Sequence, residues 1–156
     1  MMISLILNIL VAAATPKPLV QGMSWSIPVK VLVDSDTLGI VQADSASPRL
    51  EIRTRPSYPN ATAERREILA STIKNIRHLR TQLIDSSSGI DSASRWWFQA
   101  DYDVSLAGRP HHMVGKWIVH SGRTTQFLCV TDSVSWALQA PRVKALLRSI
   151  LWEKTP

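Results

Sequence analysis

The sequence predicts an α+β fold, an antiparallel β-sheet flanked by amphipathic helices. The main observation lies between residues 95 and 132, where three strand-like runs are separated by two turn signals. Strands joined so tightly pair antiparallel, because parallel neighbours need a long crossover connection. The second observation is an apolar stripe at helical spacing on each side of that segment. Helices with one apolar face cover a sheet.

The first 14 residues predict a signal peptide. The segment from Met2 to Ala14 has no charged residue, and it ends in the small residues Ala12, Ala13 and Ala14. It is too short to span a bilayer, which takes about 20 residues. Residues 15–22 then form an N-terminal spacer. The export prediction places the protein in the periplasm or outside the cell. The alternative is a buried N-terminal strand or helix in a cytoplasmic protein.

Four short strands are expected before the first helix. Alternating or β-branched runs mark residues 23–27, 29–33, 38–43 and 50–55, each closed by Pro, Asp or Ser. Val29, Val31 and Val33 are expected to share one face. In the last of these runs the apolar side chains alternate with charged ones, which include Arg53 and Arg55.

The period then changes to that of a helix, expected from Ala63 to Ile84. Asn60 or Thr62 can cap its start. Its apolar stripe consists of Ile68, Leu69, Thr72, Ile73, Ile76, Leu79 and Leu83. Residues 85–89, Asp-Ser-Ser-Ser-Gly, are expected to stop it.

The three-stranded meander carries the strongest strand signal. One face of its first strand is apolar or aromatic at strict alternation: Trp96, Phe98, Ala100, Tyr102, Val104 and Leu106. Gly108 and Pro110 are expected to make the first turn, and Ser121-Gly122 the second. A last helical segment is expected between Val134 and Glu153. Pro141 interrupts it, so the helix starts near Pro141 or a preceding turn ends there.

Composition bounds the function. The 156 residues fit one domain, assigned to 23–156, and 45% hydrophobic content is typical of a globular protein. The net charge of +6 permits an anionic partner. However, acidic residues lie among the basic residues of the last N-terminal strand and the first helix, and no exposed aromatic side chains that could stack on bases accompany them. The sequence therefore disfavours a nucleic-acid partner. A solvated face is the simpler interpretation.

The order and residues of these elements resemble the PsbP-like superfamily. The matching parts are Trp25-Ser26-Ile27-Pro28, the first long helix, and the block that runs from His112 through Ser121-Gly122 and Phe127–Val130 to Trp136. The usual Gly-Trp after the first Pro is replaced by Val29-Lys30. The superfamily includes an extrinsic photosystem II subunit, a Ran-binding import factor, and bacterial periplasmic proteins and secretion chaperones. The resemblance, over residues 23 to 152, implies an α-β-α sandwich that mostly binds other proteins.

Candidate partner-binding residues are Trp97, Trp117 and Trp25. Trp96 and Trp97 are adjacent, so they point to opposite sheet faces, and Trp is enriched at interfaces. If helices cover both faces, these side chains belong to the core instead. The basic residues Arg53 and Arg55 complete the candidate surface.

The sequence offers two conceivable chemical sites. His111, His112 or His120 near Asp101 or Asp103 could bind a metal, but no fixed-spacing motif is present and solvated histidines are the simpler interpretation. Cys129 with His120 is the one conceivable hydrolase pair. It has no evident orienting group, and a lone Cys between Leu128 and Val130 is typical of a core.

These observations predict an exported, non-catalytic protein-binding or assembly factor. The expected partner is another protein, with no cofactor, metal or nucleic acid and no transmembrane span. Two alternatives stay open. One is a cytosolic secretion-type chaperone that binds apolar client segments. The other is a metal-dependent or cysteine hydrolase.

Overall fold

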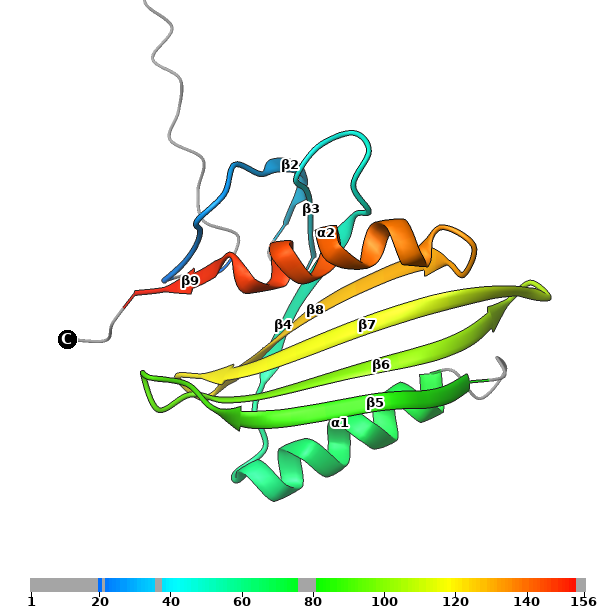
Figure 1. Ribbon diagram of the computed structural model, residues 1–156. Coiled ribbons are helices and arrows are strands. Elements are labelled where there is room, and N and C mark those ends of the chain that lie inside the picture. Colours follow the sequence, from blue (N-terminus) through cyan, green and yellow to red (C-terminus); the bar gives the residue numbers. More distant parts are fainter. Residues whose placement is uncertain (1–19, 21, 36–37, 76–80, 154–156) are drawn as a thin grey trace, which may run out of the picture.

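The computed structural model describes residues 20, 22–35, 38–75 and 81–153 (Figure 1). The predicted signal peptide, residues 1–14, and most of the spacer lie outside these residues. Among the described residues, no helix has the length and apolar character needed to cross a membrane. The elements follow in the order β1 (Met23–Trp25), β2 (Lys30–Asp34), β3 (Gly39–Gln42), β4 (Leu50–Pro56), α1 (Ala61–Asn75), β5 (Thr81–Ile90), β6 (Trp96–Leu106), β7 (Arg109–His120), β8 (Arg123–Asp132), α2 (Trp136–Arg148) and β9 (Ile150–Trp152).

The strands form one large sheet and one small ribbon. The large sheet is antiparallel, with the order β2-β3-β4-β8-β7-β6-β5. In the ribbon, β1 pairs antiparallel with β9, so the first and last described strands lie side by side. The predicted antiparallel sheet with flanking helices is therefore confirmed, and the protein is mainly β.

The predicted meander is confirmed as β6, β7 and β8. The pairing of β6 with β7 and of β7 with β8 runs without a register shift. The first turn is Ala107-Gly108, with φ of 49° and 74°, and the second is Ser121-Gly122, with φ of 50° and 72°. Two successive positive φ angles match the hand of twisted strands. Pro110 was expected in the first turn but lies within β7, opposite Ser105.

The prediction of one helix from Ala63 to Ile84 is wrong at its end, where residues 81–84 belong to β5. Ile76 and Leu79 of the predicted stripe lie outside the described residues. Asn60 caps α1 as expected, because its Oδ1 accepts a hydrogen bond from the Ala63 N–H at 2.8 Å. The helix is described up to Asn75, and Thr81 already begins β5. The Asp-Ser-Ser-Ser-Gly run that was expected to stop the helix is the middle of this strand. Pairing with β6 supplies the strand conformation that the serines alone do not favour.

The last helical segment also differs from expectation. Pro141 neither starts α2 nor ends a preceding turn but lies inside the helix. A proline there has no N–H, so the carbonyl of Ala137 lacks its usual helical donor. The helix ends at Ser149, whose N–H donates to the carbonyls of Ala145 and Leu146. The predicted helical end beyond it forms β9.

The helices pack on opposite faces of the large sheet (Figure 1). Under α2, the core contains Val143, Leu146 and Leu147 of the helix with Val41, Leu50, Ile52, Val114, Ile118, Phe127 and Cys129 of the strands. Under α1, Ile68 packs with Phe98, Ala100, Tyr102, Val104, Met113 and Trp117. The predicted apolar face of β6 is thus confirmed as the α1-side face. Two separate cores arise because successive side chains of a strand point to opposite faces.

The β2 strand departs from the predicted pattern. Its register with β3 shifts between Val31 and Val33, and these side chains are 42% and 39% exposed. A bulge changes the alternation of faces at this edge. The expected apolar face of Val29, Val31 and Val33 is therefore not buried as a unit.

Gly115 leaves room for a neighbouring indole. A Cβ at this position would lie 2.3 Å from the ring of Trp117. The ring lies back along β7 and contacts Phe98 with 5.7 Å between centroids. The α1-side core therefore depends on a missing side chain in the middle of the longest strand.

A buried carboxylate joins α1 to the sheet. Glu64 is 1% exposed and accepts hydrogen bonds from both terminal nitrogens of Arg55, from the Tyr58 N–H at 2.7 Å and from the Thr124 hydroxyl at 2.8 Å. Burial alone would raise the pKa of Glu64, but the donated bonds outweigh it and hold the pKa below its usual value. We call this set the Glu64 cluster. It links β4, α1 and β8.

Candidate functional site

The α2-side face of the sheet is only partly covered. The core beneath α2 uses β3, β4, β7 and β8, and from β6 it includes only Trp97 among the described residues. Alternation places the remaining side chains of β6 on this face, and they are polar: Gln99, Asp101, Asp103 and Ser105. In β5, Gln82 pairs with Asp103 and Asp85 with Asp101. The face is therefore open and acidic where β5 and β6 meet.

His112 lies at the boundary between the covered and open parts. Its Nδ1 is 3.1 Å from Asp103 Oδ1, and its ring stacks on Trp136 with 3.9 Å between centroids. Its side chain is 9% exposed, and its Nε2 lies 3.7 Å from Asp101 Oδ2. That nitrogen has no hydrogen-bond partner among the described residues. We call His112, Asp101, Asp103 and Trp136 the His112 cluster.

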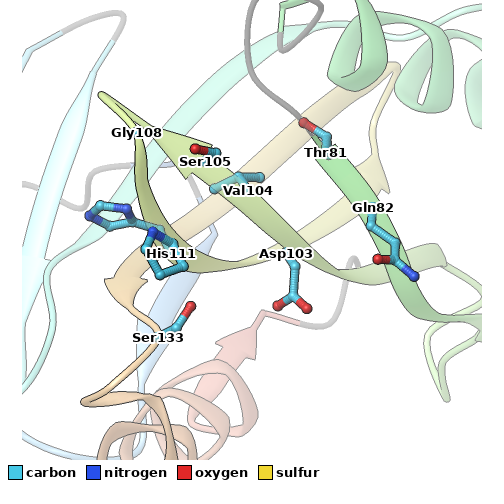
Figure 2. Close-up of a pocket in the computed structure, with 9 residues that line it drawn as sticks. Thr81, Gln82, Asp103, Val104, Ser105, Gly108, His111 and Ser133 are labelled. Carbon is cyan, nitrogen blue, oxygen red and sulfur yellow. The ribbon is translucent and has the colours of Figure 1, made fainter.

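A pocket of about 490 Å³ opens beside this cluster. Figure 2 shows that Gln82 and Asp103 project from neighbouring strands on one side of it and that Ser133 lies across from Asp103. The other lining residues come from the same ends of the strands: Thr81, Val104, Ser105, Gly108, Pro110 and His111. Hydrogen-bonding groups thus border an open hollow whose exposed lining is mainly apolar.

Two exposed apolar side chains come shortly after Ser133, the last residue of the pocket in the sequence. Val134 comes directly after Ser133 and is 89% exposed, and Leu138 in the first turns of α2 is 79% exposed. The Asp132 side chain fixes this loop by accepting the Ser135 N–H at 2.8 Å. This bond lowers the pKa of Asp132. The loop is also tied to β7, because the Ser133 N–H donates to the Pro110 carbonyl at 3.1 Å.

Asp103 in the pocket lining favours a positively charged or hydrogen-bond-donating group, and Asp101 lies next to it on the same face outside the lining. Burial raises the pKa of Asp101, although His112 and Lys144 act against this shift. Asp103 lies at the pocket wall and its side chain is 56% exposed. Its carboxylate can therefore pair with a donor that enters from solvent.

The three candidate tryptophans are placed differently from one another. Trp117 is 3% exposed and belongs to the α1-side core, so it is not on a surface. Trp97 points to the other face, where it is half-buried and lies 5.8 Å from Lys116 Nζ. Trp25 is also half-buried on the α2 side, in edge contact with Phe127. The structure therefore separates Trp117 from Trp97 and Trp25.

The two candidate arginines lie on the α1 side. Arg55 is occupied by Glu64 and holds the fold together. Arg53 pairs with Glu51 at 2.5 Å and is 59% exposed. Neither lies near the pocket, because β4 and β6 are separated by two strands.

The expected approach of His112 to Asp101 and Asp103 is found, but His120 is elsewhere. His120 lies at the far end of β7, in edge contact with Trp152. It pairs with Arg123, six residues before Cys129 in β8, so the two members of the hydrolase pair are about 20 Å apart along the strand. Burial raises the pKa of Cys129 to about 12. In the described part of the chain, no group of three His, Cys, Asp or Glu side chains is arranged to hold a metal ion.

The architecture is that of the PsbP-like fold, as the sequence resemblance implied. No protein-family model and no curated protein sequence matches the chain. Solved structures do match. Cyanobacterial PsbP from Synechocystis sp. PCC 6803 is 10% identical with a TM-score of 0.57, over 85% of this chain and 82% of that one.

Two bacterial structures are similarly close. LpqN, described as involved in cell envelope biogenesis of Mycobacterium tuberculosis, is 12% identical with a TM-score of 0.57 over 83% and 82% of the two chains. PA94 of Pseudomonas aeruginosa, a protein of unknown function described as a putative regulator, is 13% identical with a TM-score of 0.54 over 85% and 86%. At these identities the likeness shows the fold alone.

The sequence prediction missed the pocket and the exposed pair beside it. The pocket brings together four strand ends, and a linear pattern does not show which ends meet. Val134 and Leu138 are four residues apart, a spacing that also fits a buried helical face. Their surroundings, Ser133 and Ser135, were the one local sign of a loop.

Proposed function

We propose that this protein is an exported, non-catalytic binding factor that holds another protein on the open part of its α2-side face. The observation that supports this most directly is the pocket beside the His112 cluster, followed at once by Val134 and Leu138. Polar groups in a hollow next to exposed apolar side chains are typical of a protein-binding surface.

The chemistry of the surface suggests what the partner presents. A lysine or arginine side chain entering the pocket would meet Asp103, and the Ser133 and Gln82 side chains would complete its hydrogen bonds. Apolar side chains of the partner would cover Val134 and Leu138. Such an anchor, surrounded by a rim that excludes water, carries most of the binding free energy in known interfaces.

Export is supported by two independent features. The uncharged N-terminal segment has the length and the small-residue end of a signal peptide. A structural neighbour, LpqN, is described as involved in cell envelope biogenesis. We therefore propose that the protein acts in the periplasm or outside the cell.

Trp97 and Trp25 remain proposed contacts of the same partner. Both are half-buried on the α2 side, so a partner that extends along α2 would reach them. Arg53, with its exposed side chain on the other face, is proposed as a peripheral contact only. Trp117 is not included, because its ring is buried.

The experiment that tests the proposal is site-specific photo-crosslinking in the source cells. A photoreactive amino acid in place of Leu138 is expected to give one discrete adduct with a partner protein, and the same amino acid in place of Tyr58, which is 46% exposed, is not. Asp103→Asn is expected to reduce the Leu138 adduct several-fold. No adduct at Leu138, or equal adducts at both positions, would contradict the proposed surface.

The chaperone alternative is separated by the adduct pattern and the mature N-terminus. A client-binding chaperone would give many adducts at Leu138 that do not depend on Asp103. The exported factor is expected to begin at Thr15, and N-terminal sequencing that finds Met1 retained would remove the export part of the proposal.

A further inference from the structure

The two edges of the large sheet are built differently. The β2 edge is five residues long, begins with Lys30 and contains a bulge. These are features that natural sheets use to keep an edge from pairing with another chain. The β5 edge is ten residues long, and among the described residues no strand pairs with its outer side (Figure 1).

The β5 edge lacks most of these protections. Its one charged residue is Asp85, and it has no lysine and no proline. Ile84 and Ile90 are 50% and 72% exposed. Between them, Ser86, Ser87, Ser88 and Gly89 present no bulky side chain that would hinder an approaching backbone. An exposed strand of this kind offers a row of unpaired backbone donors and acceptors.

We propose that β5 is a dimerisation edge, which pairs antiparallel with β5 of a second copy across a two-fold axis at Ser87. In this register, residues at equal distances before and after Ser87 pair with each other. Ile84 therefore faces Ile90 of the other copy, and Ser86 faces Ser88. Asp85 then faces Gly89, away from the Asp85 of the other copy. The pairing joins the two large sheets into one continuous sheet.

The self-complementarity of the strand argues for a second copy rather than an unrelated peptide. Cross-strand apolar pairs stabilise a sheet, and like charges directly opposite destabilise it. In the Ser87 register the isoleucines form apolar pairs and the two Asp85 side chains are kept apart. The two-fold axis repeats each of these pairings, so each occurs twice. The bulge between Leu83 and Asp85 leaves Ile84 without a Cα partner in β6. This bulge marks one end of the segment proposed to pair with the second copy, which runs from Ile84 to Ile90.

Sedimentation of the protein purified in its exported form over a concentration series tests the proposal. The mass is expected to rise with concentration from that of one chain towards twice that value. Ile84→Lys with Ile90→Lys places lysine opposite lysine and should leave a monomer, as should Ile84→Glu with Ile90→Glu. A mixture of the two double variants should again form dimers, because each lysine then faces a glutamate.

The matched control is Val134→Lys with Leu138→Lys, which makes the same change at another exposed apolar pair. It should leave the concentration dependence of the mass unchanged. A parent chain that stays monomeric at all concentrations would overturn the proposal. So would variants of Ile84 and Ile90 that keep the parent's mass, or a mixture that does not associate.

A cysteine crosslink tests the register itself. Ser87→Cys places a thiol opposite its own copy, so mild oxidation should give a disulfide-linked dimer. Asp85→Cys is the control, because its copy would lie four residues away, about 13 Å along the strand. Cys129 is buried and does not compete. Equal crosslinking of both variants, or crosslinking of Asp85→Cys alone, would overturn the Ser87 register.

Discussion

Two ionisable clusters lie on opposite faces of one sheet, and they differ in how completely their hydrogen bonds are made. Glu64 on the α1 side receives four hydrogen bonds and is closed to solvent. His112 on the α2 side makes one bond to Asp103 and leaves Nε2 without a partner, beside a pocket. Removing a partner from a fully satisfied buried charge destabilises a fold, whereas a cluster that already contains a buried, unpaired polar atom carries a free-energy cost.

The two clusters have different roles in this fold. The Glu64 cluster joins three elements and belongs to the architecture. The His112 cluster borders an open face, and its buried Nε2 has no hydrogen-bond partner among the described residues. The predictions below test whether the closed and open regions differ as the geometry indicates.

The largest expected effect concerns Cys129, which lies in the covered part of the α2 side. Burial raises the pKa of its thiol from 9.0 to about 12, so its thiolate fraction at pH 8 falls about 1,000-fold. We expect a thiol reagent to modify native Cys129 at least that much more slowly than an exposed cysteine, such as the one introduced by Ser45→Cys in the turn after β3. Urea should abolish the difference. Fast modification of the native parent would show that the region beneath α2 is also open.

The next effect is on stability at the closed cluster. Glu64→Gln removes the charge that Arg55, Tyr58 and Thr124 satisfy, and we expect it to lower the free energy of unfolding by about 2–3 kcal/mol. Urea denaturation at pH 7 measures this change. The matched control is Glu51→Gln, the same substitution in an exposed pair with Arg53, where a change within about 0.5 kcal/mol is expected. Equal effects would remove the distinction between buried and exposed pairs.

The same cluster predicts a pH dependence. The pKa of Glu64 is lower in the folded protein than its ordinary value of 4.5, so the unfolded chain takes up a proton more readily. The stabilisation by Glu64 is therefore complete above pH 4.5 and is lost as the pH falls through the lower, folded pKa. We expect the stability difference between the parent and Glu64→Gln to shrink over that range. A difference that grows on acidification would contradict the lowered pKa.

The smallest effect has the opposite sign and belongs to the open cluster. Burial raises the pKa of Asp101, so its ionised form is disfavoured in the folded protein. Asp101→Asn is expected to give a small increase in the free energy of unfolding at pH 7, and the increase should vanish in acid, where Asp101 is protonated in both states. Urea denaturation at both pH values checks this. Destabilisation at pH 7 would show that Asp101 is held as firmly as Glu64.

Much of the sheet could be predicted from the sequence because its signal is local. The alternation from Trp96 to Leu106 repeats every two residues, and the turns at Gly108 and Gly122 mark the ends of hairpins. β5 could not be predicted in this way. Its serines have low strand propensity, and Leu83 continued the apolar spacing of the preceding helix. Its conformation comes from pairing with β6, which is information from distant residues.

The candidate site was partly predictable for the same reason. The approach of His112 to Asp103 follows from a hairpin register, which turn positions set within one or two residues. The position of Trp136 against His112 depends on how α2 crosses the sheet. Likewise, the pairing of Arg55 depends on Glu64, nine residues away in another element. Tertiary packing decided both outcomes.

The absence of a side chain at Gly115 has a consequence for how this protein evolves. Because the Trp117 indole occupies the space that a Cβ would fill, the two positions form one packing unit. A homologue that gains a methyl group at the first position is expected to carry a smaller residue at the second. Where overall identity has fallen too low to align chains, this linked pair offers a marker for sequences that keep the same inner layer.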